Sequence, residues 1–223
     1  MPQLFIIPTP IGNLEDVTLR ALRILKEVDV VIAEDTRTSG FLLKHFGIEK
    51  KILPHHKFNE RSTVNTIIDQ LKAGKKIALL SDAGTPGISD PGELLIKACT
   101  EQNIPVECLP GATALIPALV ISGFATSSFV FEGFLPRKKG RQAKLKELSK
   151  ENRTILLYES PHRIKKTIEQ SAHYFGNERR ACICRELTKL HEEVLRGSLG
   201  ELKEICKKRK LKGEMVVVIE GKG

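Results

Sequence analysis

The stretch from Lys76 to Gly92, KIALLSDAGTPGISDPG, constrains the fold more than any other part of the chain. It opens as an apolar run, Ile77 to Leu80, and then changes to Gly, Pro, Ser and Asp, a pattern typical of a buried strand that ends in a loop. Asp90, Pro91 and Glu93 then match the N-cap, N1 and N3 positions of a helix. We therefore predict a strand, a long loop of small residues, and a helix capped by Asp90.

The loop in this stretch favours a neutral or cationic ligand. It contains two carboxylates, Asp82 and Asp90, and no Lys or Arg. The chain has neither a GxxxxGK[ST] nor a GxGxxG sequence, so the nucleoside-triphosphate loop and the usual dinucleotide fingerprint are both missing. In open α/β sheets ligands bind at the carboxyl ends of strands, where glycine lets them approach the backbone. A connecting loop with helix-capping residues is the alternative.

The first half of the chain repeats this alternation of strand and helix. Strands are predicted at Leu4–Ile7, Asp29–Ala33, Ile52–Leu53 and Val106–Leu109, and helices at Thr18–Glu27, Phe41–Phe46, Ser62–Gly74 and Glu93–Gln102. Strands that alternate with helices favour a largely parallel sheet.

The character of the sequence changes after Pro110–Ala114, and we place a domain boundary near residue 118. Further strands are predicted at Phe129–Phe134, Thr154–Tyr158, Ala181–Glu186, Val194–Ser198 and Met215–Ile219, with helices at Pro161–Phe175 and Leu199–Lys207. The sequence thus predicts two α/β domains, at residues 1–118 and 119–223.

The positive charge lies in the second domain. Residues 1–118 hold 13 Lys and Arg against 14 Asp and Glu, whereas residues 119–223 hold 23 against 13. A basic half favours a polyanionic partner such as RNA, and a solvated Lys-rich surface is the alternative. The densest cluster comprises Arg137, Lys138, Lys139 and Arg141.

The five cysteines form no CxxC pair, and we expect them to be ordinary thiols in a reducing cytoplasm. Cys182 and Cys184 share one face of a predicted strand, and we interpret them as core residues in preference to a metal site. No metal is expected, because paired Cys or His ligand spacings are missing. No apolar stretch reaches 18 residues, so no membrane span is expected.

Polar clusters follow several predicted strands directly. Glu34, Asp35 and Arg37 follow the second strand, and His56 follows the third. Because strand ends on one edge of a parallel sheet converge, we expect these side chains to line one cleft. Such a set can orient a hydroxyl or phosphate and accept a proton. A helix N-cap at Asp35 or Thr36 with a surface ion pair, and a structural histidine, are the alternatives.

Nine motifs together resemble one family along nearly the whole chain. They are IPTPIGNLEDVTLRAL, AEDTR, HxxxNE, SDAGTPGISDPG, PGATA, EGFLP, YESPHR, RELTK and GEMVVVIEG. In this order they resemble the bacterial 16S ribosomal RNA methyltransferases that modify the ribose 2′-hydroxyl of cytidine-1402, within the tetrapyrrole methylase (class III) superfamily.

The resemblance implies a parallel-sheet N-terminal domain and a mixed-sheet C-terminal domain with S-adenosyl-L-methionine folded in a cleft between them. Carried over position by position, it implies cofactor contacts at Pro10, Asp82, Gly84, Thr85, Thr113, Ala114, Tyr158, Leu187 and Met215.

The resemblance also implies an enzyme that methylates a cytidine 2′-hydroxyl in 16S ribosomal RNA of the small subunit, as a cytoplasmic homodimer. Glu34, Asp35, Arg37 and His56 would then shape the catalytic end of the cleft, and the basic cluster would bind RNA phosphates. Two rivals are methylation of a tetrapyrrole carbon on the same fold and a non-catalytic RNA-binding assembly protein.

Overall fold

The computed structural model describes residues 3–223, and the chain divides into two units between Thr113 and Ala114. The predicted boundary near residue 118 lies inside helix α5 (Leu115–Ser122). This helix belongs to the second unit, because it packs on strands β8 (Arg180–Arg185) and β10 (Met215–Ile219). Among residues 3–223 no helix combines the length and the apolar character needed to cross a membrane.

The first unit is built on a five-stranded sheet of order β3-β2-β4-β1-β5. Every neighbouring pair is parallel, which confirms the predicted parallel sheet. The strands are β1 (Leu4–Ile6), β2 (Val30–Ala33), β3 (Ile52–Pro54), β4 (Ile77–Leu80) and β5 (Val106–Cys108). The central strands β1, β2 and β4 are buried throughout, as expected of strands with both faces covered.

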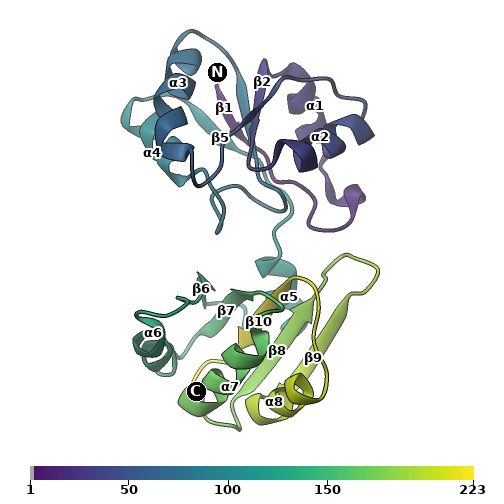
Figure 1. Ribbon diagram of the computed structural model, residues 1–223, viewed down its shortest axis with the longest axis vertical. Helices are drawn as coiled ribbons and strands as arrows, with labels where there is room; N and C mark the ends of the chain where they lie inside the picture. The colour runs from purple at the N-terminus through teal and green to yellow at the C-terminus, as the bar shows by residue number, and fades with distance from the viewer. Residues whose placement is uncertain (1–2) are drawn as a thin grey trace. The chain divides into compact units, whose positions relative to one another are not determined.

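Helices cover both faces of this sheet (Figure 1). One apolar cluster joins the sheet to α1 and α2, and a second joins its other face to α3 and α4. The helical segments are η1 (Leu14–Asp16), α1 (Leu19–Glu27), α2 (Thr36–His45), α3 (Glu60–Lys72) and α4 (Glu93–Glu101). Helix α2 begins earlier than the predicted Phe41, because Asp35 caps a first turn of weak helix formers.

The second unit is built on a mixed sheet of order β6-β7-β10-β8-β9. Strands β6 and β7 are parallel and the remaining pairs are antiparallel, which confirms the predicted mixed sheet. Besides α5, β8 and β10, the elements are β6 (Phe129–Phe134), α6 (Arg141–Leu148), β7 (Thr154–Glu159), α7 (Ile164–Phe175), β9 (Glu193–Ser198) and α8 (Leu199–Lys208).

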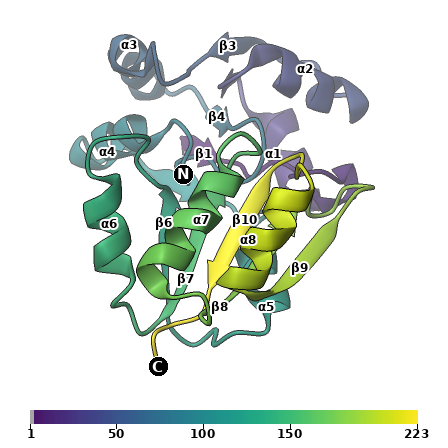
Figure 2. The ribbon, with the colours of Figure 1, turned by 60° about the horizontal axis from the view of Figure 1, so that its bottom comes forward.

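One face of the second sheet carries α6, α7 and α8 over the main apolar cluster, and α5 lies on the other face (Figure 2). Cys182 and Cys184 are buried as predicted, with their Sγ atoms 3.5 Å apart. The Cys184 Sγ lies 3.9 Å from the backbone oxygen of Ala118 in α5. Both thiols therefore belong to the packing between this sheet and α5.

Candidate functional site

Polar loops follow the carboxyl ends of the five parallel strands and lie together at one edge of the first unit. Because the strands run the same way, the segments that follow them leave the sheet on the same side. These segments are Ile7–Asn13, Glu34–Asp35, His55–Asn59, Ser81–Gly92 and Leu109–Thr113. All five hold residues that the sequence assigned to catalysis or to the cofactor.

Short hydrogen bonds join three of these loops. Thr9 and Gly84 exchange backbone hydrogen bonds of 2.8 and 2.9 Å. The Thr9 hydroxyl donates to the Ser81 carbonyl at 3.1 Å, and the Ser81 hydroxyl donates to the Gly84 carbonyl at 3.0 Å. The Thr85 hydroxyl donates to the Ala112 carbonyl at 3.0 Å. The backbone that would meet a ligand is thus fixed before the ligand arrives.

The backbone conformation at residue 84 favours glycine. Its φ of +87° is in the left-handed region, where a side chain is strained. Pro10 directly follows Thr9, which is hydrogen-bonded to Gly84, and Pro10 is half-buried. Asp82 is exposed. The candidate cofactor residues of the first unit therefore lie on loops that the structure brings together.

An acidic cluster lies beside this loop. The Asp82 Oδ1 accepts the backbone N–H of Asp35 at 3.0 Å, which joins the ends of β4 and β2. Burial and then the nearby Asp82 carboxylate raise the pKa of Glu34 above its usual value. Side-chain hydrogen bonds from Arg37 lower the pKa of Asp35 to about 2. Glu34 is therefore a stronger base than Asp35.

Asp35 also has the structural role that the sequence left open. It is the N-cap of α2, where it accepts the backbone N–H of Arg37 at 2.8 Å. The Arg37 guanidinium pairs with the same carboxylate at 2.6 Å, while its side chain is 89% exposed. The pair fixes the first turn of α2 and leaves the guanidinium open to solvent.

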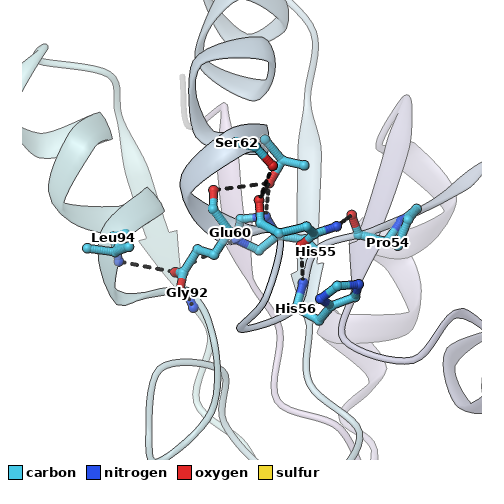
Figure 3. Close-up of polar contacts among 9 residues, drawn as sticks. Pro54, His55, His56, Glu60, Ser62, Gly92 and Leu94 are labelled. Carbon is cyan, nitrogen blue, oxygen red and sulfur yellow. Dashed lines mark hydrogen bonds and ion pairs between the residues drawn. The ribbon is translucent and has the colours of Figure 1, made fainter.

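The two histidines after β3 occupy different surroundings (Figure 3). His55 is fully buried, its Nδ1 lies 2.8 Å from the Thr63 hydroxyl, and burial lowers its pKa. His56 is half-buried, and its backbone N–H donates to the Asn59 side chain at 2.7 Å. His56, the predicted catalytic histidine, is therefore the accessible member of the pair, and His55 is a core residue.

Glu60 is a buried carboxylate that the sequence analysis did not assign to any role. Its Oε1 accepts the backbone N–H groups of Gly92 and Leu94, at 2.9 and 3.2 Å (Figure 3). The prediction that Asp90 caps α4 is wrong: Gly92 is the N-cap residue. The Pro91 carbonyl accepts the N–H of Gly87, so the loop extends beyond Asp90 and Glu60 supplies the cap from α3.

In the second unit three candidate cofactor residues lie at one edge of the mixed sheet. Tyr158 pairs with Val216 across β7 and β10, and Met215 pairs with the last residues of both β7 and β8. Leu187 follows β8 directly and is 7% exposed. Its neighbours Glu186 and Thr188 have positive φ values of 53° and 65°. Such strained backbone often occurs at functional sites.

The basic cluster divides into exposed and buried members. Arg137, Lys138 and Lys139 are exposed, and their side chains form no ion pair within the described chain. Arg141 is only 4% exposed, so its prediction as an RNA contact is wrong. Its guanidinium donates to Gln170, to Thr167 and to the Pro136 carbonyl, and thereby fixes the loop that carries the other three.

The loops of the first unit fit S-adenosyl-L-methionine. Its sulfonium is positive and its adenosine neutral, and the edge carries the carboxylates of Glu34, Asp35 and Asp82 beside a loop without Lys or Arg. Among residues 3–223, no group of three or more His, Cys, Asp or Glu side chains has the arrangement of a metal site.

A family model described as tetrapyrrole (corrin/porphyrin) methylases matches residues 3–203. The chain belongs to this family. Members are S-adenosylmethionine-dependent methyltransferases, and that is the enzyme class and the cofactor of this protein.

Two curated relatives are similar over nearly the whole chain. The Thermotoga maritima protein named ribosomal RNA small subunit methyltransferase I is 47% identical over 222 residues, covering 100% of both chains. The Synechocystis protein of the same name is 49% identical over 219 residues, covering 98% of this chain and 78% of its own.

Two solved structures share the fold at low identity. Diphthine synthase has a TM-score of 0.76 at 16% identity and covers 97% of this chain and 89% of its own. Cobalt precorrin-4 methyltransferase has a TM-score of 0.68 at 18% identity and covers 97% of this chain and 94% of its own. These matches confirm the predicted tetrapyrrole methylase fold and say nothing about the acceptor.

Proposed function

We propose that this protein methylates the 2′-hydroxyl of a cytidine, cytidine-1402, in the 16S ribosomal RNA of the small subunit. The observation that carries the proposal is the 47% identity over the full length to a ribosomal RNA small subunit methyltransferase I. The exposed, unpaired cations at Arg137 to Lys139 support it, because RNA binding depends on neutralising phosphates.

We propose that each unit contributes its own set of cofactor contacts. The first set is Pro10, Asp82, Gly84, Thr85 and Thr113, and the second is Ala114, Tyr158, Leu187 and Met215. The carboxylates beside Asp82 attract the sulfonium. The loop hydrogen bonds of Thr9, Ser81 and Thr85 keep the backbone in place without further ordering on binding.

The bound cofactor supplies an electrophilic methyl group on a positively charged sulfur. In the transfer that this group would supply, the acceptor 2′-oxygen would gain the methyl carbon as the carbon–sulfur bond breaks with its electron pair left on sulfur, and the chain's part would be to hold these atoms in line. The hydroxyl proton passes to a carboxylate of the chain. Alignment of the three reacting atoms can contribute roughly 7–11 kcal/mol, and a positioned base typically adds about 10²–10⁴-fold.

We propose Glu34 as the proton acceptor, with Asp35, Arg37 and His56 shaping its surroundings. Glu34→Gln should lower the single-turnover rate of methyl transfer by about 10²–10⁴-fold, because the amide cannot accept the proton. The wild-type rate should fall as the pH is lowered, because Glu34 becomes protonated at a pKa above its usual value. Asp35→Asn, the matched control, should cost less, since the Asp35 carboxylate is a weak base. Equal losses in the two variants would reject Glu34.

The exposed cations at residues 137–139 should contact RNA phosphates. Replacing Lys138 and Lys139 by Glu should weaken RNA binding and reduce the steepness of its salt dependence by roughly 0.7–0.9 per lost contact. The matched control replaces Lys72 and Lys75, both exposed in the first unit. Binding isotherms at several salt concentrations measure both slopes, and an unchanged slope in the Lys138/Lys139 variant contradicts this part.

The decisive test is methyl transfer from labelled S-adenosylmethionine to small ribosomal subunits from cells that lack this protein. Label at a cytidine ribose oxygen supports the proposal. Cofactor binding without label in RNA directs the search to tetrapyrroles, and RNA binding without methyl transfer favours a non-catalytic assembly protein. We further propose that the protein acts in the cytoplasm and that it is a homodimer. Sedimentation of the purified chain will test the dimer.

A further inference from the structure

A cavity of about 130 Å³ lies in the first unit beside the acidic cluster. Its wall comes from the loop after β1, from the middle of α2 and from the end of β4. The lining residues include Pro10, Leu14, Ser39, Phe41, Leu42 and Asp82. An apolar cavity of about 150 Å³ accepts one benzene molecule, so this cavity, which is of similar size, has room for a single six-membered ring.

The charge of the cavity excludes an anionic occupant. None of its lining residues is Lys or Arg, and Asp82 places a carboxylate in the wall. The Asp82 Oδ1 already accepts the N–H of Asp35, and the carboxylate has further lone pairs to offer. A phosphate or carboxylate group would be repelled, whereas a neutral ring that carries an amino donor would be bound.

Apolar side chains on α2 and on the first loop can pack against a flat ring. Phe41 lines the cavity and is 65% exposed, although aromatic residues make up only 5% of the chain. Leu42 lines it too and is 7% exposed. Proteins that recognise an unstacked base commonly stack it on an exposed aromatic ring.

The cavity is already formed and offers an unused polar group. Thr9 and Ser81, which both line it, are tied to each other and to Gly84 by side-chain hydrogen bonds. Ser39 is 2% exposed, and within residues 3–223 its hydroxyl has no hydrogen-bond partner. A buried hydroxyl without a partner is costly, and a polar ligand atom would satisfy it.

We propose that this cavity holds the pyrimidine base of the nucleotide that is methylated, and that Asp82 favours cytosine over uracil. This inference rests on the proposed function. Enzymes that modify a nucleotide within RNA or DNA take it out of the stack into a fitted pocket. A carboxylate accepts a hydrogen bond from the cytosine N4 amino group, whereas uracil presents an acceptor oxygen there.

The first experiment measures kcat, the KM for ribosomal subunits and the Kd for S-adenosylmethionine in full-length Phe41→Ala. Loss of stacking should raise the KM about 10- to 100-fold and leave the cofactor Kd unchanged. Phe41→Tyr keeps a ring and should restore the KM. The matched control is Leu19→Ala, which removes an 86% exposed side chain outside the cavity. An unchanged KM in Phe41→Ala overturns the proposal, and so does a raised cofactor Kd, because the cavity would then belong to the cofactor.

The second experiment measures base selectivity with subunits that carry cytidine or uridine at the target position. The wild-type ratio of kcat/KM values should favour cytidine at least about tenfold, and Asp82→Asn should bring this ratio close to one, because the amide both donates and accepts. The ratio is taken within each variant, so any change in cofactor binding cancels. An unchanged ratio in Asp82→Asn overturns the role of Asp82. Wild-type protein that methylates neither substrate instead rejects the proposed function.

Discussion

Replacing Glu159 by alanine will lower the free energy of unfolding of the second unit by about 3–5 kcal/mol, the typical effect of removing one member of a buried charge network. Glu159 ends β7 and is 2% exposed. Its Oε1 accepts the N–H of Ser160 at 2.9 Å and lies 3.2 Å from the Arg163 Nε, and its Oε2 accepts the Thr167 hydroxyl. The variant leaves the buried Thr167 hydroxyl and the partly buried Ser160 N–H and Arg163 guanidinium without their acceptor.

The network matters for function because it holds the basic loop. Arg163 donates to the Leu135 carbonyl at 2.7 Å, and Arg141 donates to the next carbonyl, that of Pro136, at 3.2 Å. Arg141 also donates to the Thr167 hydroxyl that binds Glu159. The buried Arg141 guanidinium and the partly buried Arg163 guanidinium thus fix the start of the loop that carries Lys138 and Lys139.

Tyrosine fluorescence during urea unfolding will report this unit alone. The chain has no tryptophan, and its two tyrosines, Tyr158 and Tyr174, both lie in the second unit. The matched control is Glu204→Ala, which removes an exposed carboxylate paired with Lys207 and should leave stability nearly unchanged. If both variants shift the transition equally, the buried network contributes no more than a surface ion pair.

The sequence predicted elements whose signal is local. The apolar run before Ser81 became β4, and every other predicted strand agrees with the structure to within one residue at each end. Alternation of strands and helices was sufficient for the parallel sheet. The family motifs pointed to the strand-end loops, and the structure brings those of the first unit to one edge.

The errors concern residues whose roles depend on distant partners. Asp90 has the chemistry of an N-cap, but the acceptor for α4 comes from Glu60, which is 32 positions before Gly92. Arg141 belongs to a run of cations, yet its side chain lies in the interior, where it donates hydrogen bonds to Thr167 and Gln170 on α7. Helix α7 begins at Ile164 and not at the predicted Pro161, because residues 161–163 form a turn. Sequence spacing does not show such long-range hydrogen bonds.

Replacing Glu60 by alanine will weaken S-adenosylmethionine binding at least about tenfold and destabilise the first unit by about 1–3 kcal/mol. Glu60 is 8% exposed and is the acceptor that α3 supplies for the N–H groups of Gly92 and Leu94. Gly92 has a φ of +130°, and a Cβ there would lie 2.7 Å from Leu79, so the chain has little freedom at this point. Without the carboxylate, the end of the loop that carries Asp82 and Gly84 loses its anchor.

His55 adds a pH dependence to the same cluster. Its Nε2 lies 3.9 Å from the Glu60 carboxylate and is buried without a hydrogen-bond partner in the described chain. Burial, the larger effect, lowers the pKa of His55 below 6.5, so below this pH the unfolded chain binds more protons than the folded one. Stability of the first unit should therefore fall as pH falls below about 6.5. His55→Gln should flatten this dependence, as measured by circular dichroism melting at several pH values.

Calorimetric titration with S-adenosylmethionine distinguishes positioning of the loop from simple loss of stability. Glu60→Gln keeps a carbonyl oxygen for Gly92 and Leu94 and should recover most of the cofactor affinity, although it removes the charge beside His55. Glu101→Ala, a matched control, removes an exposed glutamate at the end of α4 and should bind the cofactor as the wild type does. A Glu60→Ala protein that is folded at the assay temperature and binds with unchanged affinity would mean that the loop keeps its shape without this cap. In that case the bonds of Thr9, Ser81 and Thr85 alone order the cofactor backbone.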